Sequence, residues 1–223
     1  MKKRFFAKLF LLSILFSLVS CFDIIEEISL KDDGSGEMIL TANLSKSKTK
    51  IASLMLLDSV NGHKVPDRAE IEKSLNEAVK YLEEQNGISN VTKKADFTNY
   101  IFAIQCDFAS VENINTILSE LASKNNMGVL NTSYKFSKSE RKLVKNYTQN
   151  AKLKTEFVKL SDDDKKVFDD AYYTYIYRFN NEIESFSNKN AKVSKSKKAI
   201  MQKTLLLDLI NGTSNVTNQI KTK

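Results

Sequence analysis

The chain has 223 residues, of which 42% are hydrophobic and 27% charged, a balance typical of a globular protein rather than a disordered one. Six glycines and one proline exclude collagen-like and proline-rich chains, and two cysteines exclude a disulfide scaffold. The formal net charge of +7 would favour a nucleic-acid partner if it belonged to the folded part.

The first 21 residues have the pattern of a secretory signal. Four basic residues lie among the first eight, and residues 9–20 are uncharged and mostly apolar. This run is shorter than the roughly 20 residues of a membrane-spanning helix, which disfavours the alternative of an N-terminal anchor helix. Without residues 1–21 the chain has 30 basic and 27 acidic residues, a net charge of +3. We therefore expect no nucleic-acid partner. Net charge is −5 over 22–110 and +8 over 111–223.

The signal ends in Leu18-Val19-Ser20-Cys21, which resembles the lipobox of bacterial lipoproteins. The resemblance implies lipid attachment to the Cys21 thiol, cleavage before Cys21 and acylation of the new amino terminus. Two or more acyl chains would hold the protein firmly on an envelope membrane. Phe22 rather than Asp follows the cysteine, which in this family favours the outer membrane if the cell has one. The alternative is an ordinary signal peptide with a chance cysteine.

Residues 22–223 are expected to form one α+β domain, with a possible break between lobes near 125–130. Alternating apolar residues predict a β-hairpin over 24–44 that turns at 32–36. Helical spacing predicts helices over 47–60 and 68–85, with a capping box from Asp67 to Glu70 at the second. Strands are expected over 88–94 and 97–108.

The second half of the chain predicts a helix over 111–124, strands near 134–136 and 143–147, and a short helix capped by Ser161. A tyrosine-rich strand is expected over 171–179, residues 198–209 suit a strand or a helix, and the chain from 213 reads as loosely ordered. The expected fold class is α+β, a largely antiparallel sheet built from hairpins and packed with three to four helices.

A second resemblance rests on the hairpin directly after Cys21, with its acidic-Gly-Ser-Gly turn, and on the late tyrosine-rich strand with its Ser-Asn and Lys/Ser-rich turn. In these features the mature part loosely resembles a group of uncharacterised α+β envelope lipoproteins. That group implies no catalytic residues.

The residues that carry most enzyme chemistry are scarce. His63 is the only histidine and is expected in an exposed turn, and Cys106 is expected as a small buried hydrophobe on strand 97–108. The acidic stretches 32–37 and 162–164 fit a turn and a helix start better than a metal site. No nucleophile elbow or phosphate loop is present in the sequence. We therefore expect no catalytic residue, metal or cofactor, with a two-carboxylate hydrolase as the least favoured alternative.

Two further patterns allow a functional reading beside a structural one. Tyrosines at 173, 175 and 177 share one face of a strand, either as sheet surface or as a platform for sugar rings. Five lysines within ten residues form a solvated turn or contact anionic lipid headgroups or polysaccharide. These are Lys189, Lys192, Lys195, Lys197 and Lys198.

The expected function is that of a non-catalytic protein-interaction or structural module of the cell envelope, with an envelope protein as partner. The alternative is a carrier of lipid or glycan. Its apolar cleft would lie between helices 47–60, 68–85 and the sheet, and it would be lined by Leu54, Met55, Leu75 and Leu82.

Overall fold

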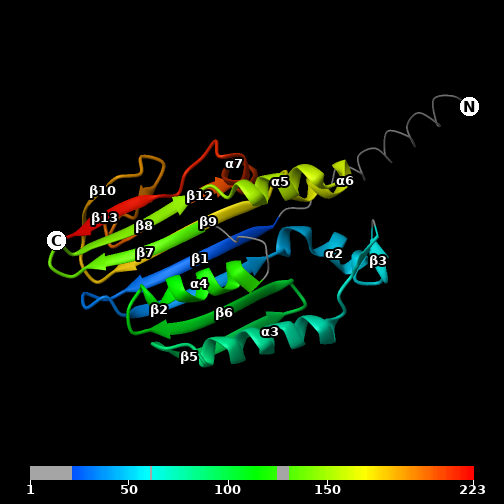
Figure 1. Ribbon diagram of the computed structural model, residues 1–223, viewed down its shortest axis with the longest axis horizontal. Helices are drawn as coiled ribbons and strands as arrows, with labels where there is room; N and C mark the ends of the chain where they lie inside the picture. The colour runs from blue at the N-terminus through cyan, green and yellow to red at the C-terminus, as the bar shows by residue number, and fades with distance from the viewer. Residues whose placement is uncertain (1–21, 61, 125–130) are drawn as a thin grey trace, which may run out of the picture.

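The computed structural model describes residues 22–60, 62–124 and 131–223. The signal segment with Cys21, and the possible break near 125–130, lie outside the described residues. The fold class is α+β, as predicted: strands form two main sheets, and helices pack beside them (Figure 1).

The larger sheet has seven strands in the order β11-β12-β9-β1-β2-β6-β5. Its neighbours are antiparallel except β1 and β9, which run parallel from the Asp23–Tyr172 pair to the Leu30–Phe179 pair. The strands are β1 (Asp23–Leu30), β2 (Gly36–Asn43), β5 (Ile88–Asp96), β6 (Ile101–Phe108), β9 (Tyr172–Phe179), β11 (Lys192–Val193) and β12 (Ala199–Leu205). Strands from both halves of the sequence therefore share one sheet.

The smaller sheet has the order β10-β13-β8-β7, with β7 (Asn131–Ser137), β8 (Lys142–Thr148), β10 (Ile183–Phe186) and β13 (Asn218–Thr222). The expectation of a loose tail after residue 213 is wrong, because β13 is an interior strand and Ile220 is fully buried. Asn218, Ile220 and Thr222 alternate with exposed residues. The sequence does not show a strand here because two of the three inward-facing residues, Asn218 and Thr222, are polar, so no apolar alternation is visible.

Two helices and the smaller sheet share one face of the larger sheet. The smaller sheet covers β9 and β1, whereas α3 (Arg68–Glu83) packs on β5 and β6, and α4 (Asn113–Lys124) lies beside β7 (Figure 1). At the start of α3, the Asp67 carboxylate accepts from the Glu70 backbone and Glu70 reciprocates, which confirms the predicted capping box.

The remaining elements lie largely at the ends of the sheets. They are η1 (Ser45–Ser47), α2 (Lys48–Leu54), β3 (Ser59–Val60), β4 (His63–Lys64), α5 (Ala151–Lys159), α6 (Asp162–Lys165), η2 (Lys166–Phe168) and α7 (Leu206–Asn211).

Several element boundaries differ from the sequence-based expectation. The helix expected over 47–60 ends at Leu54 and gives way to the β3–β4 hairpin, because its apolar side meets no surface and α2 has no buried residue. Residues 97–100 turn rather than continue a strand, with Tyr100 at φ +54°. The sequence missed α5, which Asn150 caps, and the short strands β10 and β11. Residues 198–209 contain both expected structures, β12 followed by α7.

Candidate functional site

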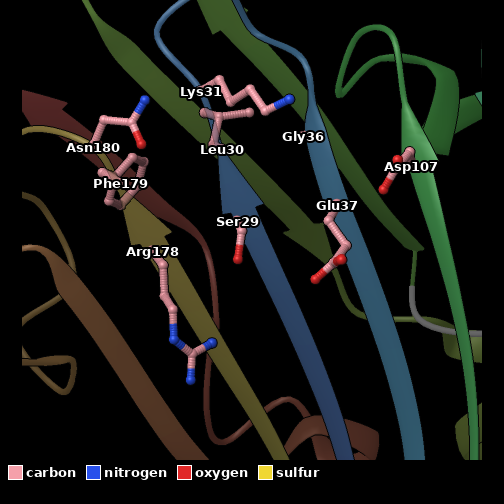
Figure 2. A pocket seen from close by; sticks show the side chains of 9 residues that line it. All are labelled: Ser29, Leu30, Lys31, Gly36, Glu37, Asp107, Arg178, Phe179 and Asn180. Atoms are coloured by element: carbon pink, nitrogen blue, oxygen red, sulfur yellow. The ribbon is translucent and has the colours of Figure 1, made fainter.

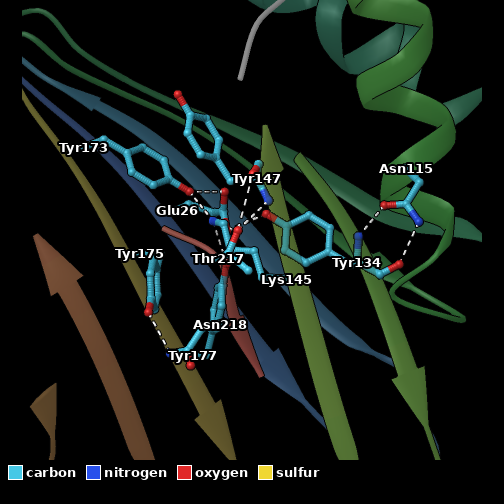
Figure 3. Close-up of polar contacts among 10 residues, drawn as sticks. All are labelled: Glu26, Asn115, Tyr134, Lys145, Tyr147, Tyr173, Tyr175, Tyr177, Thr217 and Asn218. Carbon is cyan, nitrogen blue, oxygen red and sulfur yellow. Dashed lines mark hydrogen bonds and ion pairs between the residues drawn. The ribbon is translucent and has the colours of Figure 1, made fainter. Parts of the chain in front are cut away.

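A buried ion pair joins the two sheets. Glu26 of β1 and Lys145 of β8 meet between the layers, with Lys145 Nζ 3.0 Å from Glu26 Oε1 (Figure 3). The Lys145 side chain is 0% exposed and that of Glu26 7%. An isolated charge in such a place would be strongly unfavourable, so its partners decide whether the fold tolerates it.

Three tyrosine hydroxyls complete the coordination of this pair. Tyr134 and Tyr173 each donate to the Glu26 carboxylate at 2.6 Å, and Tyr177 donates to it as well. Lys145 donates to the hydroxyl oxygens of Tyr173 and Tyr177 and to Glu26. An ammonium has three protons, so every proton of Lys145 has an acceptor in this cluster.

The charge of Lys145 and the tyrosine hydroxyls together set the ionisation of Glu26. Burial alone would raise the pKa of its carboxyl, but the Lys145 charge and the hydroxyls of Tyr134, Tyr173 and Tyr177 outweigh burial and lower the pKa below its ordinary 4.5. Burial beside the carboxylate raises the pKa of all three tyrosines well above 10, which keeps them neutral donors. Burial lowers the pKa of Lys145 from its ordinary 10.5, opposed by the charge and the hydrogen bond of Glu26. Because each proton of Lys145 has an acceptor, we assign the cluster as a carboxylate held by an ammonium and three phenols.

Flanking contacts hold the tyrosines in place. The backbone N–H of Tyr134 donates to the side-chain oxygen of Asn115 on α4 at 2.7 Å, and its C=O accepts from the Asn115 amide at 2.8 Å (Figure 3). Since β7 is an edge strand, α4 thus supplies the hydrogen bonds that a further strand would otherwise make at Tyr134. The buried Asn218 of β13 donates to the Tyr175 hydroxyl at 2.9 Å, and the rings of Tyr175 and Tyr177 stack at 4.7 Å.

The tyrosine row is therefore not a sugar platform. Tyr173, Tyr175 and Tyr177 are each at most 1% exposed, so no external ring can reach them. The alternative of a half-exposed sheet surface is also wrong, because a second sheet covers this row. We assign the cluster a structural role, since it is sealed from any substrate.

An apolar pocket lies on the same face of the larger sheet, where α3 and α4 leave β2 and β6 partly uncovered. Its volume is about 730 Å³, within the roughly 300–1,000 Å³ of small-molecule sites. The register pairs Met38 with Cys106 and Leu40 with Ile104, so these four side chains form its floor. Its walls come from the two helices: Ser74, Glu77, Ala78, Tyr81 and Leu82 of α3, and Ile114, Ile117 and Leu118 of α4.

The chemistry of this pocket is almost entirely apolar. Glu77 is its only acidic or basic lining residue, and its exposed carboxylate lies 3.9 Å from Lys73, so the charge stays in water. The cleft expected from the sequence involved α2, but of its four residues only Leu82 lines the pocket. Leu54 and Met55 lie on or after the shortened α2, and Leu75 is absent from the lining.

Cys106 lies in the pocket floor and is 6% exposed, which confirms the expected buried thiol. Burial raises its pKa from 9.0 to about 11, assisted by the charges of Asp107 and Glu37. The group is therefore a protonated, apolar part of the lining at neutral pH.

A second, polar hollow of about 410 Å³ lies at the end of the sheet where β1 ends and β2 begins (Figure 2). Three of its charged groups already have partners: Arg178 binds Glu27 at 2.7 Å, Glu37 accepts from Gln105 at 2.7 Å, and Asp107 accepts from Asn90 at 2.8 Å. The fourth, Lys31, is exposed to solvent. Gly36 is required here, since a Cβ would lie 2.1 Å from the Ser29 carbonyl oxygen. The hollow has no buried, unpartnered group that would select a ligand.

The other residues singled out in the sequence are dispersed. His63 is exposed and lies 3.7 Å from Asp164, and Ser161 caps α6 by accepting from the Asp164 backbone at 3.2 Å. Among the described residues, no three His, Cys, Asp or Glu side chains gather as metal ligands. Over the same part of the chain, no helix combines the length and apolarity needed to cross a bilayer.

The C-terminal part of the lysine run, residues 195–198, lies at the end of the larger sheet opposite to Phe22. Ala199, which directly follows Lys198, pairs with Arg178, and Arg178 pairs with Ser29 near the end of β1. The structure thus places Lys195, Lys197 and Lys198 at the end of the sheet opposite to Phe22, whereas Lys192 pairs with Met201, level with Glu27 in the middle of β1. Contact of these four lysines and Lys189 with headgroups or polysaccharide stays a prediction.

Comparisons with known proteins add little. No protein-family model matches the chain, and no curated protein matches it. Among solved structures it is similar to the folded domain of the Mycobacterium tuberculosis protein LppM, determined by NMR, with 13% identity and a TM-score of 0.42, over 91% of this chain and 89% of that one.

Removing one partner of the buried pair should be strongly destabilising. Lys145→Met leaves the Glu26 carboxylate buried without its cation and should cost about 3–5 kcal/mol of unfolding free energy. The double variant Glu26→Gln/Lys145→Met should recover part of this loss. Urea unfolding of the wild type, Lys145→Met and the double variant measures the order of their stabilities. A double variant that is less stable than Lys145→Met would contradict a coupled pair.

The same variants predict a pH effect. The folded-state pKa of Glu26 lies below its ordinary 4.5, so the unfolded chain takes up the proton first as pH falls. Wild-type stability should therefore fall as pH drops below about 4.5, and this slope should be smaller in the double variant. Equal slopes in unfolding curves between pH 3 and 6 would contradict the assigned carboxylate.

The raised pKa of Cys106 predicts slow alkylation. A thiol with a pKa of about 11 has roughly a hundredfold less thiolate at neutral pH than one at 9.0. Iodoacetamide should modify Cys106 at least that much more slowly in the folded than in the urea-unfolded protein. Comparable rates, followed by mass spectrometry of the Cys106 peptide, would exclude burial in the pocket floor.

Proposed function

We propose that the protein is a lipid-anchored lipoprotein of the cell envelope whose folded domain binds an apolar ligand, such as an acyl chain, between α3 and α4. The observation that carries the proposal is the pocket of about 730 Å³ with its apolar floor and walls. A hydrocarbon entering it would replace water against ten apolar or aromatic lining side chains, counting Cys106, which favours binding by the hydrophobic effect.

The role is one of binding rather than catalysis. The pocket brings together no nucleophile and base, since Cys106 is held in its thiol form and Glu77 points its charge to solvent. An uncharged hydrocarbon suits this lining better than a glycan, because a sugar needs several hydrogen-bond partners that Ser74, Glu77 and Tyr81 alone would have to supply. An envelope protein partner, and retention at the outer membrane, stay predictions from the sequence.

The anchor is supported by the Leu-Val-Ser-Cys sequence and by the short chain between Cys21 and the fold. β1 begins at Asp23, so the domain would sit directly on the membrane. Cys21→Ala should abolish incorporation of radiolabelled palmitate and leave the uncleaved precursor. Persistent labelling or normal cleavage, seen as a size shift on a gel, would contradict attachment at Cys21.

Filling the pocket should block ligand binding. In vesicles that contain a phospholipid with a diazirine in its acyl chain, irradiation should crosslink peptides from α3 and β2 of the wild type. Ala78→Phe places a ring in the pocket and should reduce this crosslinking several-fold. Ala69→Phe, on the same helix but outside the lining, is the matched control.

Equal crosslinking of both variants at the α3 and β2 peptides would overturn the acyl-chain proposal. Circular dichroism and thermal unfolding of the two variants check that each retains the fold. With the fold intact in both, a reduced signal in Ala78→Phe alone reports the pocket.

A further inference from the structure

An apolar turn projects from the end of the molecule at which the chain enters the fold. α2 ends at Leu54, and Leu54-Met55-Leu56-Leu57 follow one another without a charged residue. Leu56 is 86% exposed and Leu57 is 51% exposed. Among the described residues, Leu56 is the most exposed large hydrophobic residue. Four consecutive apolar residues on a surface call for a partner, because water solvates them poorly.

This turn lies close to the expected anchor. Lys46, which precedes α2, contacts the Asp23 carboxylate at 3.0 Å, and Asp23 is two residues after Cys21 in the sequence. The seven residues of α2 advance only about 10 Å. Figure 1 shows α2 and β3 at the same end of the molecule as the start of β1 and α6, and the 3.7 Å contact of His63 with Asp164 joins β4 to α6.

The charge around the turn suits an anionic lipid surface. Lys46, Lys48 and Lys50 are exposed, and residues 44–57 contain no acidic side chain, although the exposed Asp58 follows the turn directly. Lysines beside exposed leucines are the combination that binds the headgroup and acyl boundary of a membrane. The acidic first turn of α6, Asp162–Asp164, is less suited, which centres the contact on α2 rather than on α6.

We infer that residues 46–57 dock on the bilayer that carries the Cys21 lipid, with the 54–57 turn among the acyl chains and the three lysines at the anionic headgroups. The inference rests on the proposed lipid anchor but not on the pocket. It fixes the orientation of the domain: β1 runs away from the membrane for eight residues, about 26 Å, which is beyond the roughly 8–10 Å range of screened charges. Lys195, Lys197 and Lys198, in the turn at the far end of the sheet, then lie away from this bilayer.

The test uses a single tryptophan, because the chain has none. Full-length protein processed in the cell is reconstituted in vesicles that contain phosphatidylglycerol, with or without a doxyl-labelled lipid. Leu56→Trp should give blue-shifted emission that the doxyl lipid strongly quenches. Phe186→Trp, on β10 at the other end of the molecule and 40% exposed in wild type, should be insensitive to it (Figure 1).

A charge test follows from the same orientation. Lys48→Glu/Lys50→Glu in the Leu56→Trp background should weaken the quenching, whereas Lys195→Glu/Lys198→Glu, in the turn at the far end of the sheet, should leave it unchanged. Both pairs make the same change in net charge, so only position separates them.

The docking test can fail independently of the tests of the Cys21 anchor and of the pocket. The mass of the N-terminal peptide shows whether Cys21 is lipidated, and crosslinking at α3 reports the pocket, so each can fail alone. An unquenched Leu56→Trp in protein that floats with the vesicles would overturn the inference. So would a blue shift without doxyl quenching, since the residue would then lie in a protein contact.

Discussion

The packing of the two sheets depends on the ion pair of Glu26 and Lys145. Glu26 lies on β1, on an apolar face of the larger sheet. Lys145 lies on β8, an interior strand of the smaller sheet. Neither is tolerable alone in a buried interface, but Tyr134, Tyr173 and Tyr177 supply the remaining hydrogen bonds. The pair thus specifies which strand lies opposite which, because a shifted register would bury both charges without partners.

The pocket exists because one part of the larger sheet's face is covered by the smaller sheet and another part by the helices α3 and α4. The smaller sheet packs closely over β9 and β1, where the tyrosines fill the interface. Over β2 and β6 the cover consists of two separate helices, α3 and α4, and α4 is bound to β7 through Asn115. Since α4 is held toward the smaller sheet and α3 packs mainly on β5, the floor between them remains partly open.

The parallel pairing of β1 with β9 determines which segments lie at each end of the molecule. The chain start, the end of β2 and the start of β9 meet at one end, with α2 and α6 near them, while the turns after β1 and β9 lie at the other. A lipid on Cys21 would place the first end at the membrane. The lysines of 46–50 and those of 195–198 are therefore separated by the length of the sheet, although the sequence shows both as ordinary basic runs.

The sequence alone predicted the α+β class, the hairpin of β1 and β2 and the α3 capping box, all of which the structure confirms. The signal segment and its lipobox resemblance stay predictions. All of these features depend on local order: side-chain alternation, capping residues and turn glycines act within a few residues. It also indicated a buried Cys106, because the thiol stands between apolar residues of one strand face. Only tertiary structure decided the role of Glu26, which interrupts an apolar face in the sequence, and of Lys145, whose partner is 119 residues away. The interior position of β13 and the site of the pocket were decided in the same way, because burial there follows from contacts between distant strands rather than from the pattern of any one segment.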